Sequence, residues 1–201
     1  MERSLTKIRD VDLKILSELD DRDLLNYCRT HKYGNELCNN EDFWRNRVQI
    51  KFPGAEKIKS PNMNWKIFYL KIIYYSNKYE GGNRAMLEAA KRNDIDMVQF
   101  FVMQGAFDFE GGLQLAAKKG NRKLVDFFIE QAKSKGREWG QWEWDFGLRW
   151  SAYGGHIDLM KFFIAKGADD LDSAMNTAAM GGQKNAIDYL ISQGVNKIRK
   201  I

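Results

Sequence analysis

One pattern of small and apolar residues occurs four times between residue 85 and about residue 196. Each copy is anchored on the second residue of a small pair, and the anchors are Ala90, Ala117, Ala152 and Ala179. Glycine or asparagine follows three positions later, and large apolar residues follow at eight and eleven positions. Self-similarity in one register is the sequence mark of a repeat architecture. The chain is therefore predicted to contain four stacked repeats.

Each repeat predicts two short helices. The small pair allows the first helix to approach its neighbour closely, and the following glycine or asparagine adopts positive φ and ends that helix. Val98, Phe101 and Val102 show the helical spacing of apolar residues in the second helix. The phenylalanine pairs Phe100–Phe101, Phe127–Phe128 and Phe162–Phe163 recur in register and are predicted to be core. One repeat cannot bury these faces alone, so the repeats are expected to stack.

Extra residues interrupt the period. Successive anchors are 27, 35 and 27 residues apart, and the longer step is assigned to an insertion at residues 133–146. Trp139, Trp142, Trp144 and Trp150, four of the six tryptophans, fall within 12 residues here. The indoles either fill gaps on the outside of the stack or form an aromatic binding surface, since tryptophan dominates binding hot spots. In an extended segment, Trp142, Trp144 and Phe146 would lie on one side.

The repeated unit resembles the ankyrin repeat, whose core reads L-x-x-A-A-x-x-G-x-x-x-x-V-x-x-L-x-x-x-G-A. The resemblance implies an ankyrin-type helical solenoid of about four short repeats over residues 83–201. The residues that usually form the projecting β-turn finger are missing, so a stack of helices alone is expected. In this family the position two before the anchor and the two positions after it face the concave, target-binding surface.

Those concave positions are mainly basic in the first two repeats and mainly aromatic or small in the last two. They are Glu88, Lys91, Arg92, Leu115, Lys118, Lys119, Trp150, Tyr153, Gly154, Thr177, Met180 and Gly181. The cations either keep the face soluble or, with the aromatic end, suit an acidic segment that carries an apolar anchor. The predicted target-binding residues are Lys91, Arg92, Leu115, Lys118, Lys119, Trp139, Trp142, Trp144, Trp150 and Tyr153.

A different pattern precedes the repeats. Residues 8–52 predict three short helices, with Asp20–Asp21 and Asn39–Asn40 as caps before the second and third. Their apolar faces contain Val11, Ile15, Leu16, Leu19, Leu24, Leu25, Cys28, Phe43, Trp44 and Val48. A bundle of this size is marginal alone and usually needs a partner or a covering element.

The string SELDDRDLLNYCRTHKYGNELCNNEDFWRN resembles an F-box, a three-helix domain assigned here to residues 1–56. Lys7–Ile8 replaces the family's opening Leu-Pro, which contacts the Skp adaptor of cullin–RING ubiquitin ligases. The resemblance implies adaptor binding through Ile8, Val11, Ile15, Leu16, Leu19, Leu24, Leu25 and Trp44. An F-box followed by short ankyrin repeats resembles F-box/ankyrin proteins of large DNA viruses.

Residues 57–82 are interpreted as a connector helix that covers the exposed end of the first repeat. Trp65, Phe68, Tyr69, Ile72 and Ile73 fall on one helical face, and Gly81–Gly82 marks the boundary with the repeats. The lysines of this segment form either a solvated face or a contact with phosphate or a membrane surface.

Composition excludes several classes of protein. With 44% hydrophobic and 29% charged residues, the chain is neither disordered nor collagen-like. No apolar run approaches the ~18–20 residues of a membrane span, and the start has no apolar core of a secretory signal. The 32 basic and 27 acidic residues form no polybasic arm, so a nucleic-acid binder is not expected. Cys28 and Cys38 are expected to be free thiols in a reducing, cytoplasmic compartment.

No enzyme motif is apparent. The sequence contains no G-x-S-x-G, no P-loop and no plausible Cys–His–acid trio, and His156 is interpreted as a structural cap. Catalytic residues, a metal site and a cofactor are therefore not predicted. We expect an all-α, monomeric, non-enzymatic adaptor that joins a ubiquitin ligase to a target protein in the cytoplasm, of a host if the protein is viral. The alternative is a scaffolding ankyrin protein, such as a viral particle or host-interaction component, without ligase binding.

The register makes a testable prediction about Ala117. Because each repeat depends on its neighbours, the array should unfold as one cooperative unit. Ala117→Leu should overpack a close helix contact and lower the free energy of unfolding by ~1–3 kcal/mol, measured by urea denaturation. An unchanged free energy of unfolding would show that the register is wrong.

Overall fold

The computed structural model describes residues 9–195, which form thirteen α-helices and one 3-10 helix and contain no strand. This confirms the predicted all-α fold. The chain divides into two compact units, Met1–Lys78 and Tyr79–Ile201. Among the described residues, no helix combines the length and the apolar character needed to cross a membrane.

The first unit contains α1 (Arg9–Glu18), α2 (Asp21–Thr30), α3 (Lys32–Leu37), α4 (Glu41–Lys51), the 3-10 helix η1 (Ala55–Lys57) and α5 (Trp65–Lys78). Two predicted caps are confirmed. The Asp20 carboxylate accepts a hydrogen bond from the Asp23 amide at 2.8 Å, and Asn40 accepts one from the Phe43 amide at 3.2 Å. The sequence predicted three helices here and missed α3, because six residues are too few to show a helical period.

The predicted connector helix, α5, packs on α4 within the first unit. Phe68, Tyr69 and Ile72 are buried, and the Tyr69 ring lies 5.3 Å from the Trp44 ring, centroid to centroid. The compact unit therefore extends past the domain end assigned at residue 56. That this helix covers the first repeat stays a prediction.

The two cysteines were expected to be free thiols, and the structure differs. Cys28 in α2 and Cys38 at the C-cap of α3 form a disulfide, with their Cα atoms 5.8 Å apart, so the prediction of free thiols is wrong. Both residues are buried. Their separation of ten residues did not reveal the pairing, because the unpredicted helix α3 is what brings the chain back beside α2.

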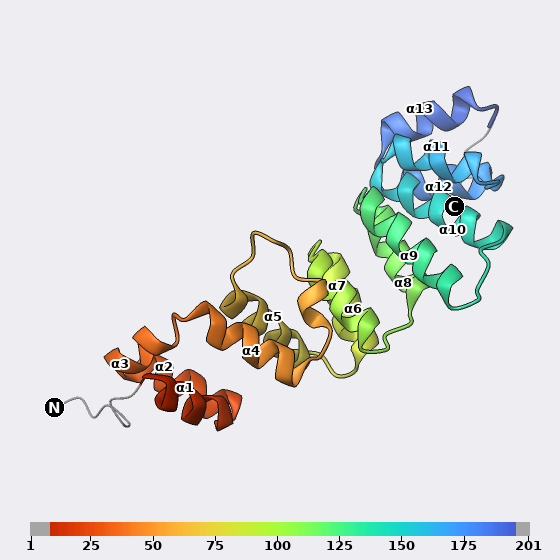
Figure 1. Cartoon of the computed structure of the whole chain (residues 1–201). Coiled ribbons are helices and arrows are strands. Elements are labelled where there is room, and N and C mark those ends of the chain that lie inside the picture. The colour runs from red at the N-terminus through yellow and green to blue at the C-terminus, as the bar shows by residue number, and fades with distance from the viewer. Residues whose placement is uncertain (1–8, 196–201) are drawn as a thin grey trace. The chain divides into compact units, whose positions relative to one another are not determined.

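The second unit consists of four helix pairs, drawn from yellow-green to blue in Figure 1. The pairs are α6 (Gly82–Lys91) with α7 (Ile95–Met103), α8 (Phe109–Lys118) with α9 (Arg122–Ser134), α10 (Gln141–Gly154) with α11 (Ile157–Ala165), and α12 (Leu171–Met180) with α13 (Lys184–Ser192). The first helices, α6, α8, α10 and α12, contact one another in that order. The predicted positive φ angles are confirmed at Asn93, Gly120, Gly155 and Gly182.

Burial follows the register with two exceptions. The anchors Ala90, Ala117 and Ala152 are buried, whereas Ala179 in the last pair is exposed. The second member of each phenylalanine pair is buried as predicted, but Phe127 and Phe162 are half-buried and so only partly core.

The inserted residues lengthen the two flanking helices, α9 and α10. Helix α9 continues past Ala132 to Ser134, and the following turn has its positive φ at Gly136. Helix α10 has 14 residues, compared with 10 in α6, α8 and α12. The idea of an extended segment is therefore wrong, and Trp142, Trp144 and Phe146 do not line one side of a strand.

Two glycines five positions before the anchors provide a close contact that the sequence analysis missed. A Cβ atom at Gly112 would lie 2.4 Å from the Phe128 ring, and one at Gly147 would lie 2.3 Å from the Phe163 ring. Each ring is fully buried against the helix backbone that this glycine leaves bare. The helices of these two pairs thus approach more closely than any larger residue allows.

Gly147→Ala should lower the free energy of unfolding by ~1–3 kcal/mol, because the added Cβ overlaps the Phe163 ring. The matched control is Gly82→Ala, where the nearest atom would be 3.7 Å away and alanine's helix propensity is an advantage. Urea denaturation followed by circular dichroism measures both. Equal stability of Gly147→Ala and wild type would show that Phe163 has room to move.

Candidate functional site

A buried guanidinium joins the helices of the first unit. Arg47 in α4 is 2% exposed. It donates hydrogen bonds to the carbonyl oxygens of Ser17 (2.9 Å) and Leu19 (2.6 Å), to the Tyr69 hydroxyl (2.9 Å) and to the Asp21 carboxylate (2.8 Å). Carbonyls at the end of a helix lack partners within it, so Arg47 both caps α1 and ties it to α2, α4 and α5.

One carboxylate, Asp21, pairs with two cations, Arg47 and Lys51. Burial by itself opposes ionisation of Asp21, but hydrogen bonds from Lys51, Tyr69 and Arg47 hold the pKa of Asp21 below its ordinary value. Burial raises the pKa of Tyr69 above its ordinary value, and the hydrogen bond to Asp21 raises it further. At neutral pH the cluster therefore contains charged Arg47 and Asp21 beside a neutral Tyr69.

The predicted adaptor-binding residues separate into core and surface. Leu16, Leu24 and Trp44 are buried, so they shape the bundle and are not available to a partner in this structure. Val11 is 42% exposed and Ile15 is 39% exposed, one turn apart on α1. Leu19 and Leu25 are half-buried, and Ile8 lies outside the described residues.

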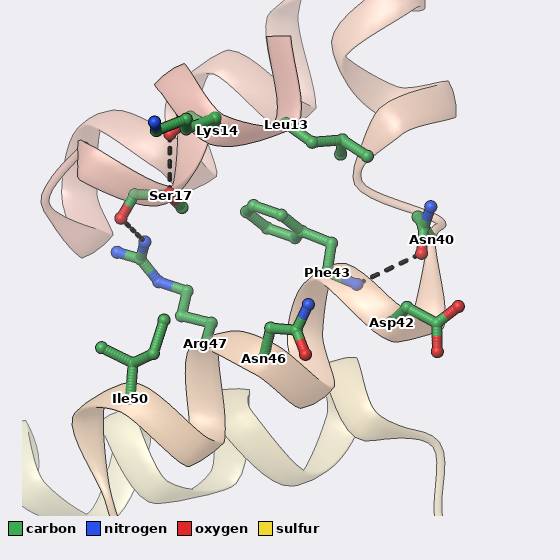
Figure 2. Close-up of a pocket in the computed structure, with 9 residues that line it drawn as sticks. All are labelled: Leu13, Lys14, Ser17, Asn40, Asp42, Phe43, Asn46, Arg47 and Ile50. Carbon is green, nitrogen blue, oxygen red and sulfur yellow. Dashed lines mark hydrogen bonds between the residues drawn. The ribbon is translucent and has the colours of Figure 1, made fainter. Parts of the chain in front are cut away.

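A groove of about 410 Å³ lies between α1 and α4, on the flank of the Arg47 cluster. It is lined by Leu13, Lys14, Ser17, Asn40, Asp42, Phe43, Asn46, Arg47 and Ile50. Figure 2 shows the Phe43 ring between the two helices and the Arg47 guanidinium turned toward Ser17. Ile50 at its edge is 73% exposed, and the sequence analysis missed it because it lies outside the motif.

The second surface is a row of rings on α10, here called the aromatic ladder: Trp142, Phe146, Trp150 and Tyr153. Consecutive ring centroids are 5.3, 6.2 and 5.6 Å apart. The rings recur at spacings of four, four and three residues, which places them on one helix face. The Lys118 ammonium from α8 lies 4.3 Å from the Tyr153 ring centroid. Four of the predicted target-binding residues therefore lie close together, namely Lys118, Trp142, Trp150 and Tyr153. Phe146, which was not among the predicted residues, lies in the same row.

Trp139 and Trp144 lie apart from the ladder. Their rings pair with each other at 5.9 Å, and both side chains are half-buried. The same loop is held by Arg137, which contacts Glu110 and lies 3.6 Å from Glu143. These two indoles therefore pack against each other within the insertion, and their predicted role in target binding stays a prediction.

The remaining predicted target-binding residues lie along the first two repeats. Lys91 forms an ion pair with Glu88 at 3.5 Å, and Arg92 donates to the Tyr79 hydroxyl at 3.2 Å. Lys119 is exposed, and Leu115 is half-buried.

His156 links two repeats. It occupies the N-cap position of α11, as expected of a structural cap, but its side chain makes no cap hydrogen bond. Its Nε2 atom lies 3.0 Å from the Lys118 carbonyl oxygen instead. Over residues 9–195, no group of three or more His, Cys, Asp or Glu side chains is placed to hold a metal ion.

Comparison with known families identifies both units. Residues 9–50 match the F-box-like family model, and residues 113–201 match the model for ankyrin repeats in three copies. The chain joins an F-box-like domain to ankyrin repeats. Both families are protein interaction modules, which supports a protein–protein interaction adaptor. Comparison with curated proteins gives no significant match.

The ankyrin match begins at α8, and the structure extends the array to the preceding pair, α6 and α7. Asn83 accepts hydrogen bonds from the amides of Phe107 (2.7 Å) and Asp108 (3.1 Å) in the next repeat. Asp145, at the same register position, accepts them from the amides of Asp169 (2.8 Å) and Asp170 (3.1 Å). The first pair therefore makes the same cross-repeat contact as the third.

The Asp21 cluster predicts a pH dependence. Because folding lowers the pKa of Asp21, its contribution to stability is present above the unfolded pKa of ~3.9 and is lost as pH falls through the folded value. Asp21→Asn should flatten the loss of stability between about pH 5 and pH 3. It should also cost about 3 kcal/mol near neutral pH, because Arg47 loses its counter-charge.

Urea unfolding of the full chain measures these effects, and hydrogen exchange of the α1–α4 amides assigns them to the F-box-like unit. Glu36→Gln, which removes an exposed carboxylate from the same unit, should behave as wild type. The same acid dependence in Asp21→Asn and wild type would contradict this account of the cluster.

Proposed function

We propose that this protein is a non-enzymatic adaptor whose F-box-like unit docks on the Skp adaptor of a cullin–RING ubiquitin ligase, while its ankyrin array holds a target protein. The observation that carries the proposal is the F-box-like match over residues 9–50, combined with apolar side chains that this unit leaves exposed. We further propose that the protein is a monomer on its own and acts in the cytoplasm, of a host if it is viral.

The docking surface is proposed to centre on Val11 and Ile15. They are four residues apart on α1 and more than a third exposed, in a small bundle that gains by covering them. Leu16, Leu24 and Trp44 act indirectly, since they fix the position of α1 from inside the bundle.

A ligase of this class acts where disulfides are normally kept reduced, so the fold must persist with Cys28 and Cys38 as thiols. A hydrogen bond to the same turn supports persistence of the fold without the disulfide. The Trp44 indole Nε1 donates to the Cys38 carbonyl oxygen at 2.7 Å and holds the same turn without the disulfide. Both cysteines are buried and so contribute packing in either redox state.

The second candidate function is a scaffolding ankyrin protein, such as a viral particle or host-interaction component, without ligase binding. One sequence observation favours it. Lys7–Ile8 stands where the F-box family has the Leu-Pro that contacts the adaptor.

Binding of the full chain to purified Skp adaptor, measured by calorimetry under reducing conditions, separates the two functions. Wild type should bind with a Kd of about micromolar or tighter, and Ile15→Asp should abolish binding because a charge replaces a desolvated contact. Leu16→Asp is a poor test, since that side chain is buried and the variant would disrupt the bundle itself.

The matched control is Ile50→Asp, a more exposed isoleucine that lines the groove between α1 and α4. It should bind as wild type does. If Ile50→Asp loses binding and Ile15→Asp retains it, the adaptor occupies the groove instead. If wild type does not bind under these reducing conditions, the ligase proposal is wrong and the scaffolding function is favoured.

A further inference from the structure

Two glycines lie next to Lys118 and Tyr153 at the end of the aromatic ladder, and neither has a side chain that could cover the rings. A Cβ atom at Gly154 would lie 2.3 Å from the Lys118 carbonyl oxygen, and one at Gly181 would lie 2.2 Å from the Tyr153 carbonyl oxygen. At these two glycines, α10 approaches α8 and the end of α12 approaches α10 too closely for any side chain. The equivalent positions of the first two repeats hold Arg92 and Lys119 instead.

The ladder combines one exposed ring, Trp142, with three half-buried rings. The rings of Trp142, Phe146, Trp150 and Tyr153 follow one another along α10, and Trp142 is 55% exposed. Met180, one position before Gly181, is 68% exposed. Large rings with few rotatable bonds give contact area at low entropic cost, which is the property of binding hot spots.

Cations border the ladder without carboxylate partners. In the described part of the chain, neither Lys118 nor Lys119 forms an ion pair, and the Arg149 guanidinium lies 5.6 Å from the Phe146 ring centroid. Two carboxylates of the preceding repeats are already engaged. Glu88 pairs with Lys91, and Glu110 contacts Arg137. The face therefore presents unpaired positive charge beside apolar rings.

These rings do not form a vacant cage for a cationic ligand. The Lys118 ammonium already lies 4.3 Å from the Tyr153 centroid and 5.7 Å from the Trp150 centroid. A basic ligand would meet this charge and that of Arg149 at close range. An anionic group can pair with Lys118 while the lysine stays over the ring, so the interaction with the ring is not lost.

We infer that the ladder binds a short linear segment of a partner protein that carries carboxylates and one large apolar side chain. The apolar side chain packs on the ladder, and the carboxylates pair with Lys118 and Lys119. From Trp142 to Tyr153 the ladder spans about 16 Å at 1.5 Å per helical residue. An extended segment covers that length with about five residues. This inference rests on the proposed function only in taking the array as the target-holding unit.

The test uses the full chain and three fluorescein-labelled peptides, with binding measured by anisotropy. The peptide EEELFEEE should bind at least about tenfold more tightly than KKKLFKKK, which reverses the charge, and EEEGGEEE, which lacks the apolar anchor. Its affinity should fall as salt rises, because exposed charges are screened beyond ~8–10 Å near physiological ionic strength.

Matched variants locate the site. Trp142→Ala should weaken binding of EEELFEEE about tenfold, and Lys118→Glu should remove the preference for acidic over basic peptide. Phe107→Ala removes another exposed ring of the array, at 71% exposure, and should bind as wild type does. Lys123→Glu reverses an exposed charge on α9 and should also leave binding unchanged.

Several results would overturn the inference. They are no binding of EEELFEEE to folded wild type, equal binding of the three peptides, or equal losses in Trp142→Ala and Phe107→Ala. A wild-type dimer that Trp142→Ala converts to monomer would show that a second copy covers the ladder. Ile15→Asp should keep peptide binding and Trp142→Ala should keep adaptor binding, so failure of the ligase proposal and failure of this inference are distinguishable.

Discussion

No helix in the described part of this chain is long enough to be stable by itself. The longest have 14 residues, and isolated helices shorter than ~12–15 residues are marginal in water. Every helix therefore depends on a neighbour that covers its apolar face. In the array this requires close approach, which Ala117 and Gly147 permit because they are small and buried against the next helix or its phenylalanine. The F-box-like unit adds Arg47, which binds carbonyl groups of α1 and side chains of α2 and α5.

The two proposed binding surfaces consist of side chains that this packing leaves uncovered. Within α1, Leu16 faces the interior while Val11 and Ile15 remain exposed. Within the insertion, Trp139 and Trp144 pair with each other, whereas Trp142 remains on the surface at one end of the aromatic ladder. One surface lies on each compact unit, which is the arrangement an adaptor needs if its two partners are to bind at separate places.

Electrostatics has a different role in each unit. Arg47 and Asp21 form a hydrogen-bonded pair whose loss would leave a charge in the interior, so their role is structural. Lys118 lies over aromatic rings at the surface and has no carboxylate partner among the described residues, so its charge is available to an incoming segment. In the sequence, Arg47 and Lys118 are simply two basic residues, and nothing there distinguishes their roles. The difference arises from what surrounds each side chain.

The sequence by itself determined the features that depend on local backbone geometry. Positive φ at Asn93 and Gly120, the Asp20 cap and the helical periods follow from residue type and spacing over a few positions. The tertiary structure alone decided which tryptophans are exposed, that Cys28 meets Cys38, and that Arg47 is buried. It also decided that the insertion lengthens α9 and α10. These features depend on contacts between helices distant in sequence, and periodicity shows only that a face is apolar, not which neighbour covers it.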